Sequence, residues 1–460
     1  MQPRHSDADT IAAIATAPGT GAVGIVRLSG PRAFAISSAL TRHQPEARQA
    51  TVATLSDRRG EILDQGLVLH FPGPHSFTGE DVAELHCHGG AVLLQAILRE
   101  CLHAGARIAE PGEFSQRAFL NDKIDLLQAE AIADLIGSAS EAAARSAARS
   151  LSGAFSRAIE DLFAALVRLR VFVEAALDFP EEDIDHLLEN DVLAQLEALA
   201  AQVAQVLRKA RRGHRLREGL KLAIAGPPNA GKSSLLNRLT QRSAAIVSAI
   251  PGTTRDALHE HIQIDGLALH LVDTAGLRET TDAVEREGIR RAHHEIHSAD
   301  HVLLIVDAHN PQQRRADPET YLASASVSGS VGVTVIHNKC DLTGSAPGLR
   351  AADDQNPARI TLSARTGAGV DILCRHLLDC AGLSNPEGDS DFSARERHIV
   401  ALEVCAEHLR QGARQLKAHG AAELIAEDLR SAQDALGSVS GHLSSDDLLG
   451  EIFSSFCIGK

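Results

Sequence analysis

The stretch that decides the fold is Gly226-Pro227-Pro228-Asn229-Ala230-Gly231-Lys232-Ser233-Ser234, which fits the phosphate-binding pattern G-x-x-x-x-G-K-[ST]. An apolar run, 220–225, precedes it, and 234–239 follows with helical periodicity. A strand, a glycine-rich loop and a helix in this order predict a P-loop, whose N–H groups and helix N-terminus can surround a polyphosphate. Lys232 can reach the β- and γ-phosphates, and the Ser233 hydroxyl can bind Mg²⁺. The pattern alone still leaves an ordinary glycine turn open.

Three further motifs indicate which nucleotide binds. Asp273-Thr274-Ala275-Gly276 follows the apolar run 267–272, where a carboxylate can hold Mg²⁺ through water and a glycine N–H can sense the γ-phosphate. Asn338-Lys339-Cys340-Asp341 follows the run 331–336, and its carboxylate can accept two hydrogen bonds from guanine that adenine cannot donate. Ser363-Ala364-Arg365 can close over the base. Doubly wound sheets bind nucleotides where strands end in this way, so the order predicts GTP binding.

Composition limits the other functions of the chain. Its 460 residues predict two to four domains, and its net charge of −15 excludes a generally basic nucleic-acid-binding surface. Aromatic residues make up 3%, which argues against a base-stacking platform. The seven cysteines are scattered and never spaced C-x-x-C, which argues against disulfides and a thiolate zinc site. Because no leader or membrane-spanning run is visible, we expect a cytoplasmic protein that does not enter a membrane.

Local composition and hydrophobic periodicity predict a multidomain fold of α/β and α parts. Residues 1–120 mix short β-rich runs with glycine turns and predict an α/β domain. Residues 121–218 and 384–460 are helical in periodicity, and 219–383 form the Ras-like, doubly wound GTP-binding domain. The arrangement predicts one helical domain into which the GTP-binding domain is inserted. Within the first domain, His86-Cys87-His88 could be a metal cluster, but structural histidines are the favoured interpretation.

Several segments outside the nucleotide motifs carry a resemblance; they are 24–30, 71–74, 78–81, 111–114, 121–123 and the terminal Phe456-Cys457-Ile458-Gly459-Lys460. On these residues the chain resembles the MnmE (TrmE) family of tRNA-modification GTPases over its full length. The resemblance implies a homodimer whose N-terminal domain binds a one-carbon tetrahydrofolate, with a 5-formyl analogue as a possible ligand. With the flavoprotein MnmG, the family adds an aminomethyl-type (carboxymethylaminomethyl) group to C5 of the wobble uridine of certain tRNAs. The FAD belongs to that partner.

The resemblance also implies residues for folate binding and modification. Arg27, Glu84 and Lys123 match folate positions, with Lys460 placed beside them, since a carboxylate can pair with a pterin's amino-pyrimidine edge while cations meet its oxygens. Cys457 is implied for modification. Its alternative is a small apolar residue packed against the helical domain.

The sequence lacks the glutamine that orients the attacking water in Ras-like GTPases. Leu277 directly follows the D-x-x-G motif, where Ras-like proteins place a water-orienting Gln, so the family pattern assigns acid–base function to Glu285 acting through water. No arginine finger is identifiable, and Asn229 occupies the family's K⁺ position. The implied metal ligands are Asn229, Ser248, Ile250 and Thr253 for K⁺, and Ser233 and Thr254 for Mg²⁺. The expected GTP-binding residues are Asn229, Ala230, Gly231, Lys232, Ser233, Ser234, Ser248, Ala249, Ile250, Pro251, Gly252, Thr253, Thr254, Asp273, Thr274, Ala275, Gly276, Asn338, Lys339, Asp341, Ser363, Ala364 and Arg365.

Two interpretations of the whole chain stay open. In the first, GTP hydrolysis drives a cycle required for tRNA modification; in the second, the chain is a ribosome-assembly or regulatory switch without substrate chemistry. The N-terminal domain favours the first, because an assembly factor would ordinarily carry a basic RNA-binding domain. The densest basic run, Arg208 to Arg217, is either a tRNA phosphate contact or a solvated helix end.

Overall fold

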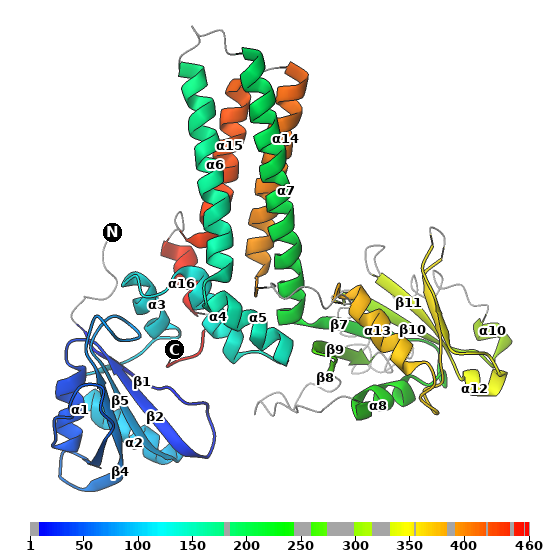
Figure 1. The fold of residues 1–460 in the computed structure, drawn as a ribbon. Coiled ribbons are helices and arrows are strands. Elements are labelled where there is room, and N and C mark those ends of the chain that lie inside the picture. The colour runs from blue at the N-terminus through cyan, green and yellow to red at the C-terminus, as the bar shows by residue number, and fades with distance from the viewer. Residues whose placement is uncertain are drawn as a thin grey trace, which may run out of the picture. The chain divides into compact units, whose positions relative to one another are not determined.

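The structure is a computed structural model that describes residues 9–178, 185–242, 259–273, 299–314, 332–353, 356–383, 392–419, 422–441, 446–454 and 456–459 (Figure 1). The chain divides into two compact units. The first contains Met1–Ala133, Ser150–Val203 and Ala401–Lys460, and the second contains Asp134–Arg149 and Ala204–Val400.

The first unit begins with a six-stranded sheet of order β3-β4-β5-β2-β1-β6. Its strands are β1 (Ile11–Ile14), β2 (Gly21–Ser29), β3 (Thr51–Ser56), β4 (Ile62–Phe71), β5 (Val82–Gly89) and β6 (Arg107–Ile108). All neighbours pair antiparallel except β1 and β6. Four of these strands, β1, β2, β4 and β5, coincide with β-rich runs of the sequence at 10–15, 22–28, 67–71 and 82–87, whereas β3 and β6 were not expected.

Helices cover this sheet because its strands alternate between two faces. One face shares a buried core with α1 (Ala33–Thr41) and α2 (Ala91–His103), to which Ile36 and Ile97 contribute. The other face packs Ile11 against Phe114 of α3 (Glu113–Leu120). The predicted α/β character of the N-terminal region is therefore confirmed.

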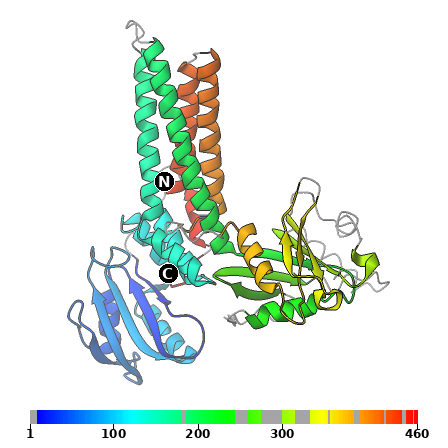
Figure 2. The same ribbon diagram turned by 45° about the vertical axis from the view of Figure 1, so that its right-hand side comes forward.

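Long helices follow the sheet: α4 (Leu126–Ile136), α5 (Glu141–Leu151), α6 (Ala154–Asp178), α7 (Asp185–Glu218), α14 (Glu396–His419), α15 (Ala422–Ser440) and α16 (Asp446–Ser454). Within the first unit, α6 and α15 run side by side with the parts of α7 and α14 that belong to it (Figures 1 and 2). Arg170 of α6 donates to Gln433 of α15 over 2.6 Å. These helices come from both predicted helical blocks, so segments far apart in sequence share one bundle.

The second unit contains a seven-stranded sheet of order β12-β13-β11-β10-β7-β9-β8. Its strands are β7 (Leu220–Ala225), β8 (His259–Ile264), β9 (Leu267–Asp273), β10 (His301–Asp307), β11 (Gly332–Asn338), β12 (Gly348–Arg350) and β13 (Ala358–Thr361). The central pairs are parallel, and the outermost pair at each edge is antiparallel. Helices α8 (Lys232–Arg242) and α13 (Val370–Cys380) share one buried core with it. This is the doubly wound fold that the motifs predicted.

One buried carboxylate in the second unit joins the chain entering the nucleotide domain to the chain leaving it. Asp134 accepts hydrogen bonds from Arg217 (2.8 Å) at the end of α7 and from Arg395 (3.1 Å) just before α14. Ser393 donates to its other oxygen over 2.6 Å. The two ends of the inserted domain thus meet at a single side chain.

A cluster of charged side chains joins α3 to the segment before β1, to β6 and to the loop before β5. Arg117 bonds Asp9 (2.6 Å), Glu80 (3.1 Å) and Glu113 (3.0 Å), and Arg107 bonds Asp9 and Glu113. Burial alone would raise the pKa of Glu113, but hydrogen bonds from Arg107, the Glu110 N–H and Arg117 lower it below its usual range. The pKa of Asp9 is lowered in the same way, against the effect of burial.

Replacing the central cation tests this cluster. Arg117→Met should lower the free energy of unfolding by about 2–4 kcal/mol, because it removes one of the two cations that pair with the buried Glu113 and the half-buried Asp9, and the cation paired with Glu80. Both folded-state pKa values are depressed, so the stabilisation is complete above about pH 5 and is lost as the pH falls below about 4. Urea unfolding of the full chain across this range measures both effects. Arg99→Met removes the same charge from an exposed position and is the control; an equal loss there would contradict the role of the cluster.

Candidate functional site

The P-loop connects the interior strand β7 to α8, and two glycines let it fit closely against neighbouring segments. A Cβ on Gly226 would lie 2.1 Å from the carbonyl oxygen of Ile305 in β10, and one on Gly231 would lie 2.2 Å from the Asn338 amide. Both glycines have positive φ, at 143° and 99°, as does Asn229 at 64°. Asparagine tolerates this left-handed conformation better than most residues, and Asn229 is exposed on the loop.

The side-chain amide of Asn338, at the end of β11, ties two loops together. Its Nδ2 donates to the carbonyl of Ala230 in the P-loop over 2.8 Å, and its Oδ1 accepts from the Ala364 N–H over 2.9 Å. Asn338 is 2% exposed, so both bonds are shielded from water. The first residue of the N-K-x-D motif therefore positions the phosphate loop and the base-closing loop at once.

The phosphate-binding groups are arranged around the start of α8. Lys232 Nζ donates to the carbonyls of Gly226 (2.8 Å) and Pro227 (3.1 Å) in the P-loop. Ser233 and Ser234 lie exposed in the first turn of the helix. A polyphosphate would meet the positive end of the α8 dipole, with the Lys232 ammonium and the Ser233 hydroxyl beside it.

The base-recognition groups lie on the loops after β11 and β13. Arg365 donates to Asp341 over 2.8 Å. A hydrogen bond from Ser363 lowers the pKa of the Asp341 carboxyl, and the Arg365 charge lowers it further. An ionised acceptor that offers no donor matches the N1–H and amino group of guanine. The three motifs after β7, β11 and β13 thus lie together, as the sequence predicted.

Two residues that support the nucleotide motifs, Asp307 and Arg238, were not predicted from the sequence. Lys339 has φ of 68° and donates to Asp307 at the end of β10 over 2.7 Å. Arg238 of α8 donates to the carbonyl of Ala364 over 3.1 Å and also to that of Arg365. No sequence motif surrounds Asp307 or Arg238. Only the end of the apolar run that forms β10 could have drawn attention to the aspartate.

Several predicted residues lie outside the described ranges. They are Ser248, Ala249, Ile250, Pro251, Gly252, Thr253, Thr254, Thr274, Ala275, Gly276, Leu277, Glu285 and Lys460. Asp273 ends β9, where the D-x-x-G motif was expected. Roles for these positions remain predictions.

In the N-terminal domain, two of the predicted folate residues form one ion pair. Antiparallel pairing of β2 with β5 sets Arg27 opposite Glu84, and the guanidinium lies 2.9 Å from the carboxylate. His86 lies 3.0 Å from the other Glu84 oxygen. The Arg27 guanidinium also lies 5.7 Å from the ring centre of Phe77, within cation–π range.

The segment that carries Lys123 packs against the loop before β5. Lys123 donates to the carbonyl of Pro74 over 2.8 Å, and Asn121 donates to that of Thr78 over 2.7 Å. A Cβ on Gly79 would lie 2.9 Å from Asn121, so the two segments are in close contact. Phe77, beside Arg27, belongs to the same loop. The structure therefore brings Arg27, Glu84 and Lys123 to one part of the domain.

The C-terminal segment docks on the N-terminal domain. The Gly112 N–H donates to the Cys457 carbonyl over 3.3 Å, and Ile458 bridges to Pro111. A Cβ on Gly459 would lie 2.4 Å from the carbonyl of Ile14, at the end of β1. Phe456 is buried with residues of α4 and α16, whereas Cys457 is exposed. The thiol is thus held in place through its backbone while its sulfur remains accessible.

Two other sequence features have structural contacts. His86 contacts Glu84, His88 lies 2.8 Å from Asp64, and Cys87 is buried in the sheet core, so these three side chains do not converge on one point. The basic run lies in the C-terminal part of α7, where Arg217 is bound to Asp134. Arg217 is thus engaged with a buried carboxylate, which matches neither interpretation, and a tRNA contact by the rest of the run stays a prediction.

The fold and site define a GTP-binding protein with a Ras-like nucleotide domain. A family model described as the MnmE helical domain matches residues 126–457, and one described as the GTP-binding protein TrmE N-terminus matches 10–123. The curated tRNA modification GTPase MnmE of Stutzerimonas stutzeri is 56% identical over 98% of this chain and 99% of its own. The protein of that name from Marinobacter nauticus is 54% identical over 100% of both chains.

The chain belongs to the MnmE family of tRNA modification GTPases, and it is a GTP hydrolase. The MnmE of Sodalis glossinidius is likewise 54% identical over 99% of this chain. Within the ranges that the structure describes, no helix is both long and apolar enough to cross a membrane.

Base selectivity should depend on the carboxylate of Asp341. Hydrogen bonds to a charged group contribute about 1.5–3 kcal/mol each, so Asp341→Asn should weaken GTP binding by roughly 100-fold or more. The new amide can donate to the 2-carbonyl of xanthine, so the variant should prefer xanthosine triphosphate. Equilibrium titration with both nucleotides measures the change. Arg365→Ala keeps the carboxylate and should cost less than about tenfold; an unaltered preference for GTP in Asp341→Asn would refute the assignment.

Proposed function

We propose that this GTPase works with the flavoprotein MnmG to place a carboxymethylaminomethyl-type group on C5 of the wobble uridine of certain tRNAs in the cytoplasm. A one-carbon tetrahydrofolate bound to the N-terminal domain is the carbon donor, and the FAD is held by MnmG. The main support is the docking of the C-terminal Cys457–Gly459 segment beside β1 and α3. A GTPase acting only as a switch has no need for an exposed thiol held in this way.

The residues of the N-terminal domain fit a folate. Arg27 and Glu84 supply a cation and an anion side by side, and Phe77 supplies a neighbouring aromatic face. Lys123 adds a second cation at the loop that carries Phe77. A pterin needs both polar partners and a flat apolar contact, and its glutamate tail needs cations. Lys460, one residue beyond the docked Gly459, is proposed to join them.

The nucleotide domain, residues 219–383, is proposed to bind GTP with Mg²⁺ on Ser233 and Thr254. Leu277 cannot orient water, so Glu285 is proposed to act on the attacking water through a second water. Asn229 fits a role in holding K⁺, because its amide lies exposed on the rim of the P-loop. The other proposed K⁺ ligands are Ser248, Ile250 and Thr253. The ion supplies the positive charge that an arginine finger supplies elsewhere.

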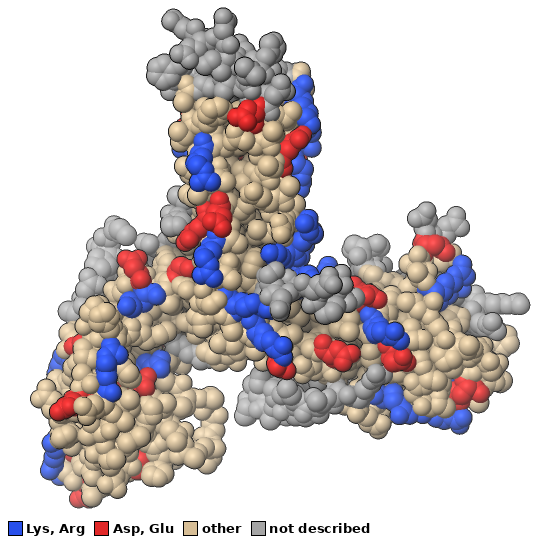
Figure 3. Space-filling model, viewed as in Figure 1, with Lys and Arg blue, Asp and Glu red and all other residues tan. Residues whose placement is uncertain are grey.

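The protein is proposed to act as a homodimer, as the family resemblance implies, in which the two nucleotide domains meet. Contact with tRNA is proposed to be local. On the face seen in Figure 3, Lys and Arg side chains are interspersed with Asp and Glu and form no continuous basic field. The net charge of −15 fits that distribution.

The role of Asn229 makes GTP hydrolysis dependent on K⁺. Replacing K⁺ by Na⁺ at equal ionic strength should lower kcat steeply, by roughly tenfold or more, since each 1.4 kcal/mol of lost charge stabilisation is a factor of ten. Asn229→Gly suits the left-handed backbone, so it should keep GTP affinity but lose K⁺ activation. Asn229→Lys should hydrolyse GTP equally in both salts. Equal turnover of the unmutated protein in K⁺ and Na⁺ would contradict the proposal.

The modification itself is tested in cells. A deletion strain should lack the C5 modification of wobble uridine, measured by mass spectrometry of its tRNA, and expression of this chain should restore it. Cys457→Ser should fail to restore it while its GTPase rate and folate binding in vitro stay normal, because the thiol lies outside every nucleotide motif. Persistence of the modification in the deletion strain would favour the switch alternative. Full restoration by Cys457→Ser would leave the thiol without a role.

A further inference from the structure

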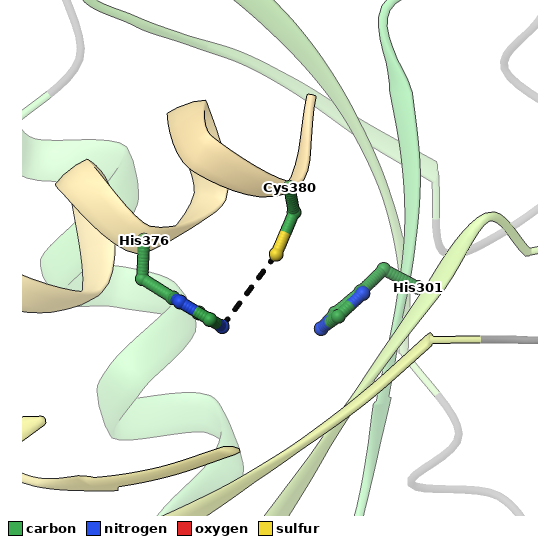
Figure 4. Close-up of side chains that lie close together, drawn as sticks. All are labelled: His301, His376 and Cys380. Atoms are coloured by element: carbon green, nitrogen blue, oxygen red, sulfur yellow. Dashed lines mark hydrogen bonds between the residues drawn. The ribbon is translucent and has the colours of Figure 1, made fainter. Parts of the chain in front are cut away.

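A second group of reactive side chains lies in the nucleotide domain, away from the GTP motifs. His376 and Cys380 stand one turn apart on α13, and His301 begins β10 (Figure 4). In the part of the chain that the structure describes, their ligand atoms all lie within 4.8 Å of one another. Figure 4 shows the two rings and the sulfur directed at the same space from opposite elements.

Hydrogen bonds connect this group through the Thr334 hydroxyl, which lies between the two imidazoles. The Thr334 hydroxyl lies 2.8 Å from Nε2 of His301 and 2.8 Å from Nε2 of His376. The Cys380 sulfur lies 3.5 Å from the same His376 nitrogen. In either tautomer that nitrogen carries one proton or one lone pair, so it cannot form two full hydrogen bonds. The Thr334 hydroxyl and the Cys380 sulfur therefore compete for one nitrogen, and the thiol is the weaker hydrogen-bonding partner.

The spacing suits a tetrahedral ion. With Zn–N of about 2.0–2.1 Å and Zn–S of about 2.3 Å, an imidazole nitrogen and a thiolate on one zinc lie about 3.5 Å apart. The Cys380 and His376 atoms are already 3.5 Å apart. His301 needs a shift of about 1 Å, within reach of a side-chain rotation, and a turn of the Thr334 hydroxyl clears the space between the rings.

We propose that His301, His376 and Cys380 form a binding site for a borderline-soft divalent ion, of which Zn²⁺ is the natural occupant, with water as the fourth ligand. Imidazole and thiolate donors select zinc over the hard ions Mg²⁺ and Ca²⁺. Binding releases the Cys380 proton to solvent, since the thiolate is the ligand. His376 and Cys380 are only partly buried, which gives the ion a route in, whereas His301 is 7% exposed.

The site is separate from the nucleotide. His301 and Asp307 lie at opposite ends of β10, and a seven-residue strand spans about 20 Å. The ion would crosslink the first residue of β10 to the last turn of α13. The space beside His301 is kept by a glycine, because a Cβ on Gly332 would lie 2.5 Å from its Nδ1. This proposal does not depend on the modification chemistry proposed above, and either can fail alone.

Metal titration of the full-length protein tests the site. The protein is stripped of metal, the exposed thiol is removed by Cys457→Ser, and the nucleotide site is filled with GDP and excess Mg²⁺. Zinc competed against a chromophoric chelator should bind with one high-affinity equivalent per chain. Cobalt at the same site should show a thiolate-to-metal charge-transfer band. Absence of a tight equivalent would overturn the proposal and leave a hydrogen-bonded cluster only.

Matched variants locate the ion. Cys380→Ser keeps a hydrogen-bonding group beside His376 but removes the soft ligand, so it should fold and lose more than about 100-fold in zinc affinity, beyond the effect of removing an outer-shell partner. His376→Gln should also fold and lose more than about 100-fold in zinc affinity. Cys374→Ala removes a thiol from the same helix at a core position, 1% exposed, and should bind zinc normally.

Thermal unfolding provides an independent measurement. Zinc should raise the Tm of the parent and of Cys374→Ala, because an ion that binds only the folded state stabilises it, and should leave that of Cys380→Ser unchanged. Undiminished zinc affinity in Cys380→Ser and His376→Gln, or an equal rise of Tm in all variants, would place the zinc elsewhere and overturn the proposal.

Discussion

The nucleotide site depends on one buried amide. Asn338 holds the carbonyl of Ala230 and the N–H of Ala364, so the loops after β7, β11 and β13 are fixed relative to one another before any ligand arrives. An amide is suited to this because it offers a donor and an acceptor in one plane. Gly231 must lack a side chain because that amide occupies the space a Cβ would need. The constraint explains why a phosphate motif and a base motif widely separated in sequence form one site.

The strands that carry motifs could be predicted from the sequence, because an apolar run followed by glycine and polar residues marks the end of a buried strand. The apolar run 220–225 forms β7, and the runs before the other motifs, 267–272, 331–336 and 360–362, correspond to β9, β11 and β13. β10 was missed although it is as apolar as β7, since no motif follows it. Its end supplies Asp307, which holds Lys339. The side chains that support the motifs, Asp307 and Arg238, are selected by tertiary contact, which sequence periodicity does not report.

Pairing between distant elements accounts for the rest of what the sequence did not predict. The Arg27–Glu84 ion pair follows from the register of β2 against β5, which a single-residue slip would abolish. The sequence argued against a thiolate zinc site because it has no C-x-x-C spacing. Such an argument detects only ligands that lie close together in the chain. His301 reaches His376 and Cys380 through the parallel sheet and the helix that covers it, so this cluster is visible only after folding.

The insertion of the nucleotide domain into the helical region also has a physical basis. An inserted domain is tolerated when its two ends lie close together, and here both approach Asp134. Arg217 and Arg395 share this carboxylate inside the second unit, where loss of either cation would leave a buried charge only partly paired. The first cation lies on the last turn of α7 and the second lies just before α14. Asp134 belongs to α4, so a displacement of this residue would act on the end of α7 and on the start of α14 together.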